Sequence, residues 1–517
     1  MNTWFKGWCG ICVVALAVIC SYGLASGDVD QGLDVAKRLD VAIVVEGSPR
    51  MKEVDPSRLF AHAGKMFVAL LGVNDRVGVI RYVDKAEQLS ALTVVGSAAG
   101  RDALFKAIDS ISWQEPSKAG NEQTGKVNVQ EAIDSAVKVL TGADGTNADR
   151  VIILLYNAKS GIEGVIGNSS VIETLKGGGI RVFAIAVGDK DDKEPEKSGD
   201  VLCKPTGGLL YTAHQASGIY MRFASIFENL TYPMMIPIES SKINIDESIS
   251  AIAFVIKKNS PTKKLSLDNP DGVRYLPEKK PAWVDWLESD TLDVIRINEP
   301  EHGTWTLNFG YGRENKAYIW TSFRLMVNMQ DPYQDADKPL VLETWFKMGD
   351  VKMDIKELQH GFNVKAAVVD PDGSKKVLQL EPKTAVKGSN VAEVLYSNSL
   401  APMKEGKYEI EITATGKGLQ RRRTLVLVAK KHEQPKTDSP TTDVHKTDAH
   451  KTDARKFDRR LDKFIFVRTT KNGDMSFKKA VVFFMIINIV GVVGIVGYTR
   501  KKGLWKSDKL FRKQVEI

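Results

Sequence analysis

Uninterrupted apolar strands alternate with helix-like segments from Leu39 to about Pro237, and this alternation constrains the fold more than any other feature of the sequence. The strand-like runs DVAIVVE (40–46), RVIILLYN (150–157) and RVFAIAVGD (181–189) are short and rich in Val and Ile. Between them, segments such as VQEAIDSAVKVL carry apolar residues at helical spacing. Buried strands separated by helices predict a parallel sheet covered on both faces, so residues 39–237 are expected to form an α/β doubly wound domain.

The pattern changes at about residue 238 to short alternating strands broken by Gly, Pro and Asp turns, which predicts an all-β region. The turn Asn269-Pro-Asp-Gly272 recurs as Asp370-Pro-Asp-Gly373, and Gly303-Thr-Trp305 recurs as Gly406-Lys-Tyr408. A period of about 100 residues fits a repeated β-sandwich. We therefore expect two sandwich domains, residues 238–330 and 331–430, with Trp305 and Tyr408 at matching core positions. Chance recurrence of a common turn is the alternative.

The N-terminus has the features of a secretory signal. Lys6 precedes an apolar run from Ile11 to Ile19, and Gly23-Leu24-Ala25 offers the small residues of a cleavage site. The sequence predicts a signal peptide over residues 1–25, with an uncleaved anchor as the alternative. Cleavage removes three of the four cysteines and leaves Cys203, which we expect to be a buried apolar residue rather than a nucleophile.

A second apolar segment, Ala480–Tyr498, contains no charged residue and at 1.5 Å per residue spans about 28 Å, enough to cross a bilayer. A polar linker (431–479) precedes it and a basic tail (499–517) follows it. Much of the net charge of +8 lies near this segment, which favours an acidic membrane surface over nucleic acid as the partner. We expect a type I single-pass protein with its ectodomain outside the cytoplasm, in the periplasm of a Gram-negative host, and its tail in the cytoplasm.

Four landmarks in the α/β region resemble the von Willebrand factor A (VWA) family over about 200 residues. VVEGSPRM stands where the family has D-x-S-x-S-M, GKVNVQEAIDSA where it has T-N, and ILLYNAKSG where it has T-D-G. The family's Pro-Thr-Gly-Gly ending is present at Pro205–Gly208. The resemblance implies a domain that binds proteins at a metal-ion-dependent adhesion site, in which Asp, two Ser, Thr and Asp oxygens hold Mg²⁺.

Four of the five positions that would hold the ion differ from the family pattern. Glu46 replaces the first Asp, Arg50 the second Ser, Val127 the Thr and Asn157 the last Asp, while Ser48 is retained. Val127 supplies no oxygen, and the Arg50 guanidinium can instead occupy the ion's place and pair with Glu46. Thr124 is the alternative oxygen donor if the loop is misaligned.

We therefore expect no cofactor, with Mg²⁺ as the alternative and Glu46, Ser48 and Asn157 as remnants of a metal site. The expected ligand-binding surface consists of five residues: Glu46, Ser48, Arg50, Asn128 and Asn157.

The β region carries a second resemblance, over about Ile236–Val428. The segment Val284–Gly310 resembles the module that follows VWA domains in hemicentin-like proteins. It is still more similar to an uncharacterised, mostly gammaproteobacterial family of membrane-anchored VWA proteins. A spacer between the α/β domain and the membrane is the alternative role.

These features predict a membrane-anchored protein that binds another protein outside the cytoplasm. No recognised catalytic motif stands in a supporting context, so we do not expect an enzyme. A scaffold subunit of a membrane complex and a metal-dependent adhesion receptor are the alternatives. An exposed polar face at the strand ends would favour reversible binding, whereas an apolar patch on a helix would favour permanent assembly.

Overall fold

The computed structural model describes most of the chain between residues 37 and 431, namely 37–114, 127–142, 147–160, 162, 169–188, 200–308, 314–328, 332–349, 351–352, 361–386, 392–401, 403–416 and 418–431. The predicted signal peptide, the span Ala480–Tyr498, the tail and all but the first residue of the linker lie outside these residues, as does Thr124. Within the described ranges, no helix is long and apolar enough to cross a bilayer.

The first domain is built from alternating strands and helices, as the sequence predicts. Its strands are β1 (Arg38–Glu46), β2 (Arg76–Tyr82), β3 (Ala86–Val94), β4 (Ala148–Asn157), β5 (Ile180–Val187) and β6 (Leu210–Ala213). Its helices are α2 (Pro49–Val54), α3 (Leu59–Leu70), α4 (Ala98–Asp109), α5 (Val129–Thr141), α6 (Ser169–Gly177) and α8 (Ile219–Thr231). Two short 3₁₀ turns, Lys204–Thr206 and Ala216–Gly218, flank β6.

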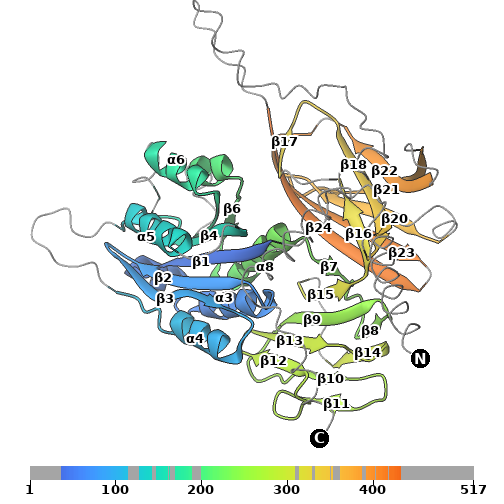
Figure 1. The fold of residues 1–517 in the computed structure, drawn as a ribbon, viewed down its shortest axis with the longest axis horizontal. Helices are drawn as coiled ribbons and strands as arrows, with labels where there is room; N and C mark the ends of the chain where they lie inside the picture. Colours follow the sequence, from blue (N-terminus) through green and yellow to red (C-terminus); the bar gives the residue numbers. More distant parts are fainter. Residues whose placement is uncertain are drawn as a thin grey trace, which may run out of the picture. The chain divides into compact units, whose positions relative to one another are not determined.

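The sheet has the order β3-β2-β1-β4-β5-β6, and all neighbouring pairs are parallel except the pair of β2 and β3. Residues 41, 43 and 45 of β1 pack with α3, α4 and α8, whereas residues 42 and 44 pack with α5 and α6. Figure 1 shows the two sets of helices on opposite faces of the sheet. The predicted doubly wound α/β fold is therefore confirmed.

Eighteen further strands form the β-rich part of the chain. They are β7 (Met234–Met235), β8 (Lys242–Ile245), β9 (Ile249–Lys257), β10 (Ser266–Asp268), β11 (Arg274–Tyr275), β12 (Val284–Glu288), β13 (Leu292–Asn298), β14 (Gly303–Asn308), β15 (Lys316–Thr321), β16 (Phe323–Val327), β17 (Tyr333–Asp335), β18 (Leu340–Met348), β19 (Val351–Lys352), β20 (Asn363–Val369), β21 (Lys375–Val386), β22 (Ala392–Leu400), β23 (Gly406–Gly416) and β24 (Leu419–Lys430).

The two copies of the sequence repeat share one backbone feature. Gly303 and Gly406 have φ angles of 130° and 133°. A Cβ atom added to Gly303 would lie 3.1 Å from the Pro270 ring, and one added to Gly406 would lie 2.6 Å from the Pro371 ring. The strand that opens with glycine thus packs closely against the Pro-Asp-Gly turn in both copies, at a φ that L side chains rarely adopt.

The two aromatic residues that mark the repeat also occupy equivalent places. Trp305 is fully buried and its Nε1–H donates to the Glu301 carbonyl at 2.8 Å. Tyr408 is buried and its hydroxyl donates to the Lys404 carbonyl at 3.1 Å. Each aromatic ring therefore fills a core while its polar atom is satisfied by the carbonyl four residues earlier.

The two sandwiches are not separate bodies. The β7 residue Met235 pairs with Tyr318 of β15 and with Arg422 of β24, so one sheet runs from β12 through β7 to the second repeat. Trp305 and Tyr408 belong to one hydrophobic cluster. In addition, β16 (Phe323–Val327) pairs with β18, so the second repeat takes strands from before the predicted boundary at residues 330 and 331.

The α/β domain packs against one face of the sheet β12-β13-β9-β15. Phe227 of α8 meets Tyr318 of β15 edge-on, with ring centroids 5.1 Å apart, and Phe67 of α3 lies 6.5 Å from Phe227. The Tyr318 hydroxyl donates to buried Glu228 at 2.8 Å, and Lys316 pairs with the same carboxylate at 3.1 Å. An apolar contact that encloses a satisfied charge resembles a domain core more than a transient interface.

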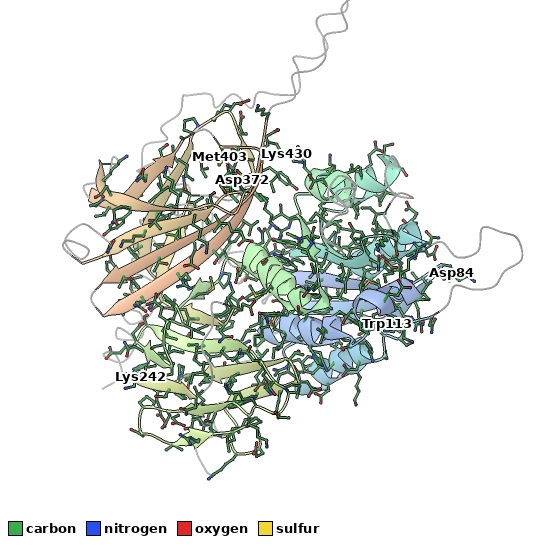
Figure 2. All side chains as sticks on the ribbon, turned by 180° about the vertical axis from the view of Figure 1, so that it is seen from behind. Asp84, Trp113, Lys242, Asp372, Met403 and Lys430 are labelled. Atoms are coloured by element: carbon green, nitrogen blue, oxygen red, sulfur yellow. The ribbon has the colours of Figure 1, made fainter. Side chains whose placement is uncertain are left out.

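The second repeat also contacts the α/β domain. Lys430, labelled in Figure 2, donates to Asp200 at 2.6 Å, and the Tyr333 hydroxyl donates to the Gly208 carbonyl at 2.8 Å. Residues 37–431 therefore behave as one folded body in their described parts.

A buried ion pair joins the two repeats. Arg421 of β24 is 1% exposed and donates to both oxygens of Asp246, at 2.9 and 3.0 Å. Its guanidinium also donates to Ser248 at 2.7 Å and to the Phe323 carbonyl at 3.2 Å. Burial alone would raise the pKa of Asp246, but the hydrogen bonds from Arg421 and Ser248 hold this pKa below its usual value.

Replacing Asp246 with Asn should cost about 3–5 kcal/mol of unfolding free energy at pH 7, because it leaves the buried Arg421 charge without a counterion. The pKa of Asp246 is lower in the folded protein than its usual value of 3.8. Asp246 therefore adds to the unfolding free energy above pH 3.8, and this stabilisation is lost as the pH falls through the folded pKa. Urea unfolding of the wild type and of Asp246→Asn measures the difference in unfolding free energy at pH 7 and shows whether this difference is smaller at pH 3.

Asp372→Asn is the matched control, since Asp372 forms an exposed ion pair with Lys404 and its loss should cost less than about 1 kcal/mol. Equal losses for the two variants would contradict the assignment of Asp246 as the counterion that joins the repeats.

Candidate functional site

The candidate site lies at the carboxyl ends of the central parallel strands. Glu46 is the last residue of β1, and Asn157 is the last residue of the neighbouring strand β4. Gly47 and Ser48 follow β1 directly and lead into α2. Because both strands end at the same edge, the polar residues that follow them come together, which is where α/β sheets generally bind ligands.

The Glu46 carboxylate is fully buried and receives three hydrogen bonds from the chain itself. The Ser48 and Ser160 hydroxyls donate to Oε1 at 2.5 and 2.6 Å, and the Asn157 backbone N–H donates to Oε2 at 2.8 Å. Burial raises the pKa of Glu46, and the three donors partly offset this effect. The side chain at the centre of the site is therefore held by internal partners on both of its oxygens.

Two tyrosines on the neighbouring strands enclose Glu46 from the side of α5 and α6. Tyr82 is the register partner of Glu46, and Tyr156 precedes Asn157. Their hydroxyls are buried and have no hydrogen-bond partner within the described part of the chain. Burial, followed by the charge of Glu46, raises the pKa of Tyr82 well above its usual value, so this phenol stays neutral.

In the segment after β1, Ser48 caps the helix α2, whereas Arg50 lies on the surface. Ser48 is the N-cap of α2, and its Oγ accepts from the Met51 N–H at 3.4 Å. The start of α2 places Arg50 on the surface, where its guanidinium donates to the Lys159 carbonyl at 3.4 Å. The expected pairing of Arg50 with Glu46 is wrong, because the hydroxyls of Ser48 and Ser160 take the carboxylate while α2 carries the guanidinium outward.

Asn157 connects the loops after β1 and β4. Its side-chain amide donates to the Arg50 carbonyl at 2.8 Å, and its Oδ1 accepts from the Lys159 N–H at 2.8 Å. The side chain therefore fixes both loops over Glu46. Of the five residues expected from the sequence, the structure brings four together: Glu46, Ser48, Arg50 and Asn157.

Asn128 has a separate role at the start of α5. Its Oδ1 caps the helix by accepting from the Glu131 N–H at 3.1 Å, and its own N–H donates to the Val83 carbonyl at 2.6 Å. Among the described residues, no hydrogen bond joins it to the other four. The neighbouring Val127 packs against the apolar cluster beneath α5 and offers no oxygen, as expected.

Ser160 is the residue of the candidate site that the sequence reasoning missed. It belongs to the ILLYNAKSG segment, three residues after Asn157, and its hydroxyl returns to Glu46. The only signal was a hydroxyl just beyond a strand end, which is common in loops. Across the described residues, no cluster of three or more His, Cys, Asp or Glu side chains is arranged to hold a metal ion.

Cys203 lies apart from these residues. It is fully buried in the apolar cluster beneath α6, and burial raises the pKa of its thiol above its usual range. A thiol of this kind is a packing residue and is unreactive at neutral pH, as the sequence predicts.

Comparison with solved structures gives distant likenesses. A von Willebrand factor type A protein from Catenulispora acidiphila is 11% identical, with 77% of this chain and 68% of that chain covered and a TM-score of 0.31. Proximal thread matrix protein 1 from the mussel byssus is 14% identical over 39% of this chain, with a TM-score of 0.31, and the match spans 49% of that protein. The VWF domain of the type V pili tip protein Mfa5 from Porphyromonas gingivalis is 12% identical, with 38% and 96% covered and a TM-score of 0.29.

A search of curated proteins gave no match. The family model for the von Willebrand factor type A domain matches residues 40–217, which run from within β1 to within the 3₁₀ turn after β6. The strand order, the helices on both faces and this match agree. Residues 40–217 are a von Willebrand factor type A domain.

Proposed function

We propose that this chain is a membrane-anchored protein, and not an enzyme, whose VWA domain binds another protein outside the cytoplasm through the carboxyl ends of its strands, without a metal. One observation carries the proposal. The Glu46 carboxylate, which stands where the family places a metal ligand, is occupied by Ser48, Ser160 and Asn157, while Arg50 is exposed beside it.

The donor set supports metal-free binding. A hard dication such as Mg²⁺ requires about six oxygen ligands, mainly from carboxylates, carbonyls and water. Glu46 is the single carboxylate among the matching positions, and Asn157 already uses its carbonyl oxygen to accept from Lys159. Binding an ion here would require the chain to break the hydrogen bonds that hold both loops.

The exposed charges suggest which chemical group the partner presents. Arg50 and Lys159 are both exposed, and the Asn157 side chain joins the two loops that carry them. A guanidinium binds a carboxylate in a planar, bidentate fashion, so Arg50 is suited to a carboxylate of the partner. In this proposal, the Arg50 guanidinium binds the partner's carboxylate in place of the Mg²⁺ ion that the family's site would hold.

The surface of the helices favours reversible binding over a permanent scaffold role. Among the described residues, Val73 and Val94 are exposed and lie outside the helices, and Val201, in the helical residues 200–203, is the single large apolar side chain exposed on a helix. The apolar faces of α3 and α8 are covered by the chain's own β region. A permanent assembly would be expected to leave a contiguous apolar patch open on a described helix.

The membrane anchor is part of this proposal and rests on the apolar segment Ala480–Tyr498 and the basic residues that follow it. The resemblance of residues 236–428 to the β module of membrane-anchored bacterial VWA proteins supports the same arrangement.

Millimolar Mg²⁺ or Mn²⁺ should leave the melting temperature of the full-length protein in detergent unchanged. A bound ion at a hundredfold excess over its Kd would add about 2.7 kcal/mol to stability. Differential scanning calorimetry with and without the ion measures this. An upward shift that disappears in Glu46→Ala but persists in Glu53→Ala, an exposed carboxylate on α2, would show that the site binds a metal.

Arg50→Glu should reduce partner binding at least about fivefold, because the reversal places a negative charge opposite the partner's carboxylate. The full-length chain, solubilised in detergent, is used to recover partners from its own host, and recovery is quantified by mass spectrometry. Lys138→Glu is the matched control, with the same charge change in the last turn of α5, at the end of the helix away from Asn128. A partner retained equally by all three proteins would not use this surface.

Protease added to sealed, right-side-out vesicles of the membrane that holds the protein should digest the described region and leave a small C-terminal fragment that contains residues 480–517. Immunoblotting with a C-terminal tag measures the fragment. Complete protection of the β region in right-side-out vesicles would rule out an ectodomain outside the cytoplasm.

A further inference from the structure

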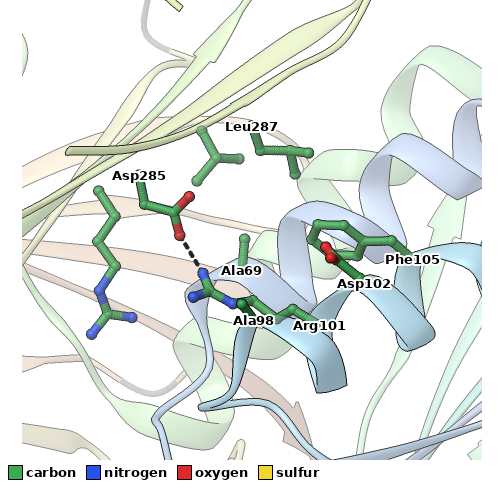
Figure 3. A pocket seen from close by; sticks show the side chains of 9 residues that line it. Ala69, Ala98, Arg101, Asp102, Phe105, Asp285 and Leu287 are labelled. Carbon is green, nitrogen blue, oxygen red and sulfur yellow. Dashed lines mark hydrogen bonds and ion pairs between the residues drawn. The ribbon is translucent and has the colours of Figure 1, made fainter. Parts of the chain in front are cut away.

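A pocket of about 140 Å³ lies between the VWA domain and the first β repeat. Figure 3 shows it between α4 on one side and the strands above it, with Asp285 and Leu287 pointing down from β12 and Ala69, Ala98 and Phe105 on the helices. The walls thus belong to two domains that are far apart in sequence. The space exists because α3 and α4 present alanines, Ala69 and Ala98, where larger side chains would fill it.

The inner part of the pocket is apolar. Phe105 of α4 and Ala69 of α3 face Leu287 and Val294 of the sheet. An engineered apolar cavity of about 150 Å³ in another protein binds benzene, so this volume suits one six-membered ring. Phe105 offers such a ring an aromatic surface.

The charged part of the pocket has one more cation than its ion pairs use. Arg101 of α4 forms an ion pair with Asp285 across the two domains. Asp285 also lies opposite Arg296 in the register of β12 and β13, but its carboxylate is directed to Arg101. The two guanidinium groups therefore share one carboxylate, and the other acidic residue of the lining, Asp102, lies beside Phe105 (Figure 3).

Arg296 makes only weak polar contacts. In the described part of the chain it forms no ion pair, and its two hydrogen bonds, to the Leu71 carbonyl and to Asn298, are both 3.4 Å long. These distances lie beyond the usual range of N–H···O bonds. Its guanidinium stacks over Trp320 at 4.5 Å, which fixes the group in place. Burial, and then the charge of Arg101, lowers the pKa of Arg296, and the nearby charge of Asp285 offsets this only in part.

We propose that this pocket binds a small aromatic carboxylate, with its ring between Phe105, Leu287 and Ala69 and its carboxylate paired with Arg296. The ligand supplies the missing counterion and fills the apolar space in one step. Because its two walls come from the VWA domain and the β repeat, a bound ligand also strengthens the contact between them. The site is separate from the strand-end surface and does not depend on the function proposed for that surface.

Ligand-observed ¹⁹F NMR of 4-fluorobenzoate with the full-length protein in detergent tests the site. We expect the ¹⁹F line to broaden and unlabelled benzoate to reverse this broadening. Benzyl alcohol and benzylamine lack the carboxylate and should compete at least about tenfold more weakly than benzoate. Equal competition by benzyl alcohol would overturn the role of Arg296. No broadening at millimolar ligand would overturn the site itself.

Two variants separate the pocket from other binding to the protein or detergent. Ala98→Leu adds volume from the exposed first turn of α4 and Leu287→Trp fills the pocket from the sheet, so each should abolish broadening. Arg296→Gln should weaken binding about tenfold or more while leaving the apolar part intact. Melting temperatures without ligand identify a variant that fails to fold, in which case the other filling variant decides. Broadening that persists in a folded filling variant would overturn the proposal.

Discussion

The packing of α3 and α8 against the sheet β12-β13-β9-β15 is the interaction on which the rest of the molecule depends. Phe227 meets Tyr318 there and Phe67 packs against Phe227, while Glu228 accepts a hydrogen bond from the Tyr318 hydroxyl and pairs with the Lys316 ammonium group. If a carboxylate buried in this way loses its partners, the folded state is strongly destabilised. The VWA domain is consequently fixed to the β region through the face that carries α3 and α8.

This arrangement explains which parts of the fold the sequence could predict. β9 (Ile249–Lys257) is apolar on consecutive residues because one side faces its own sandwich and the other faces the VWA helices. An uninterrupted apolar run in the sequence indicates that both faces of a strand are buried, but it does not indicate which elements cover them. The edge strand β3 (Ala86–Val94) was not predicted at all, since most of its residues are at least partly exposed and it offers no apolar run.

At the candidate site, the sequence predicted proximity but not partners. Glu46 and Asn157 end adjacent strands, and residues that end adjacent parallel strands must lie near each other. The hydrogen bonds made by each side chain depend on how the loops return. α2 begins at Ser48 and carries Arg50 to the surface, while Ser160 comes back to Glu46 from the loop after β4. Such paths are set by capping and local turns that strand patterns do not encode.

The short strand β7 also links the two repeats at the point where the chain leaves the VWA domain. Met235 is hydrogen-bonded to β15 on one side and β24 on the other, and β24 is paired with β23 over eleven residue pairs. Because these eleven pairs follow one another along the two strands, β24 can leave the sheet only if the whole ladder is broken. The chain that leaves the VWA domain is thereby clasped at Met235 between strands of both repeats.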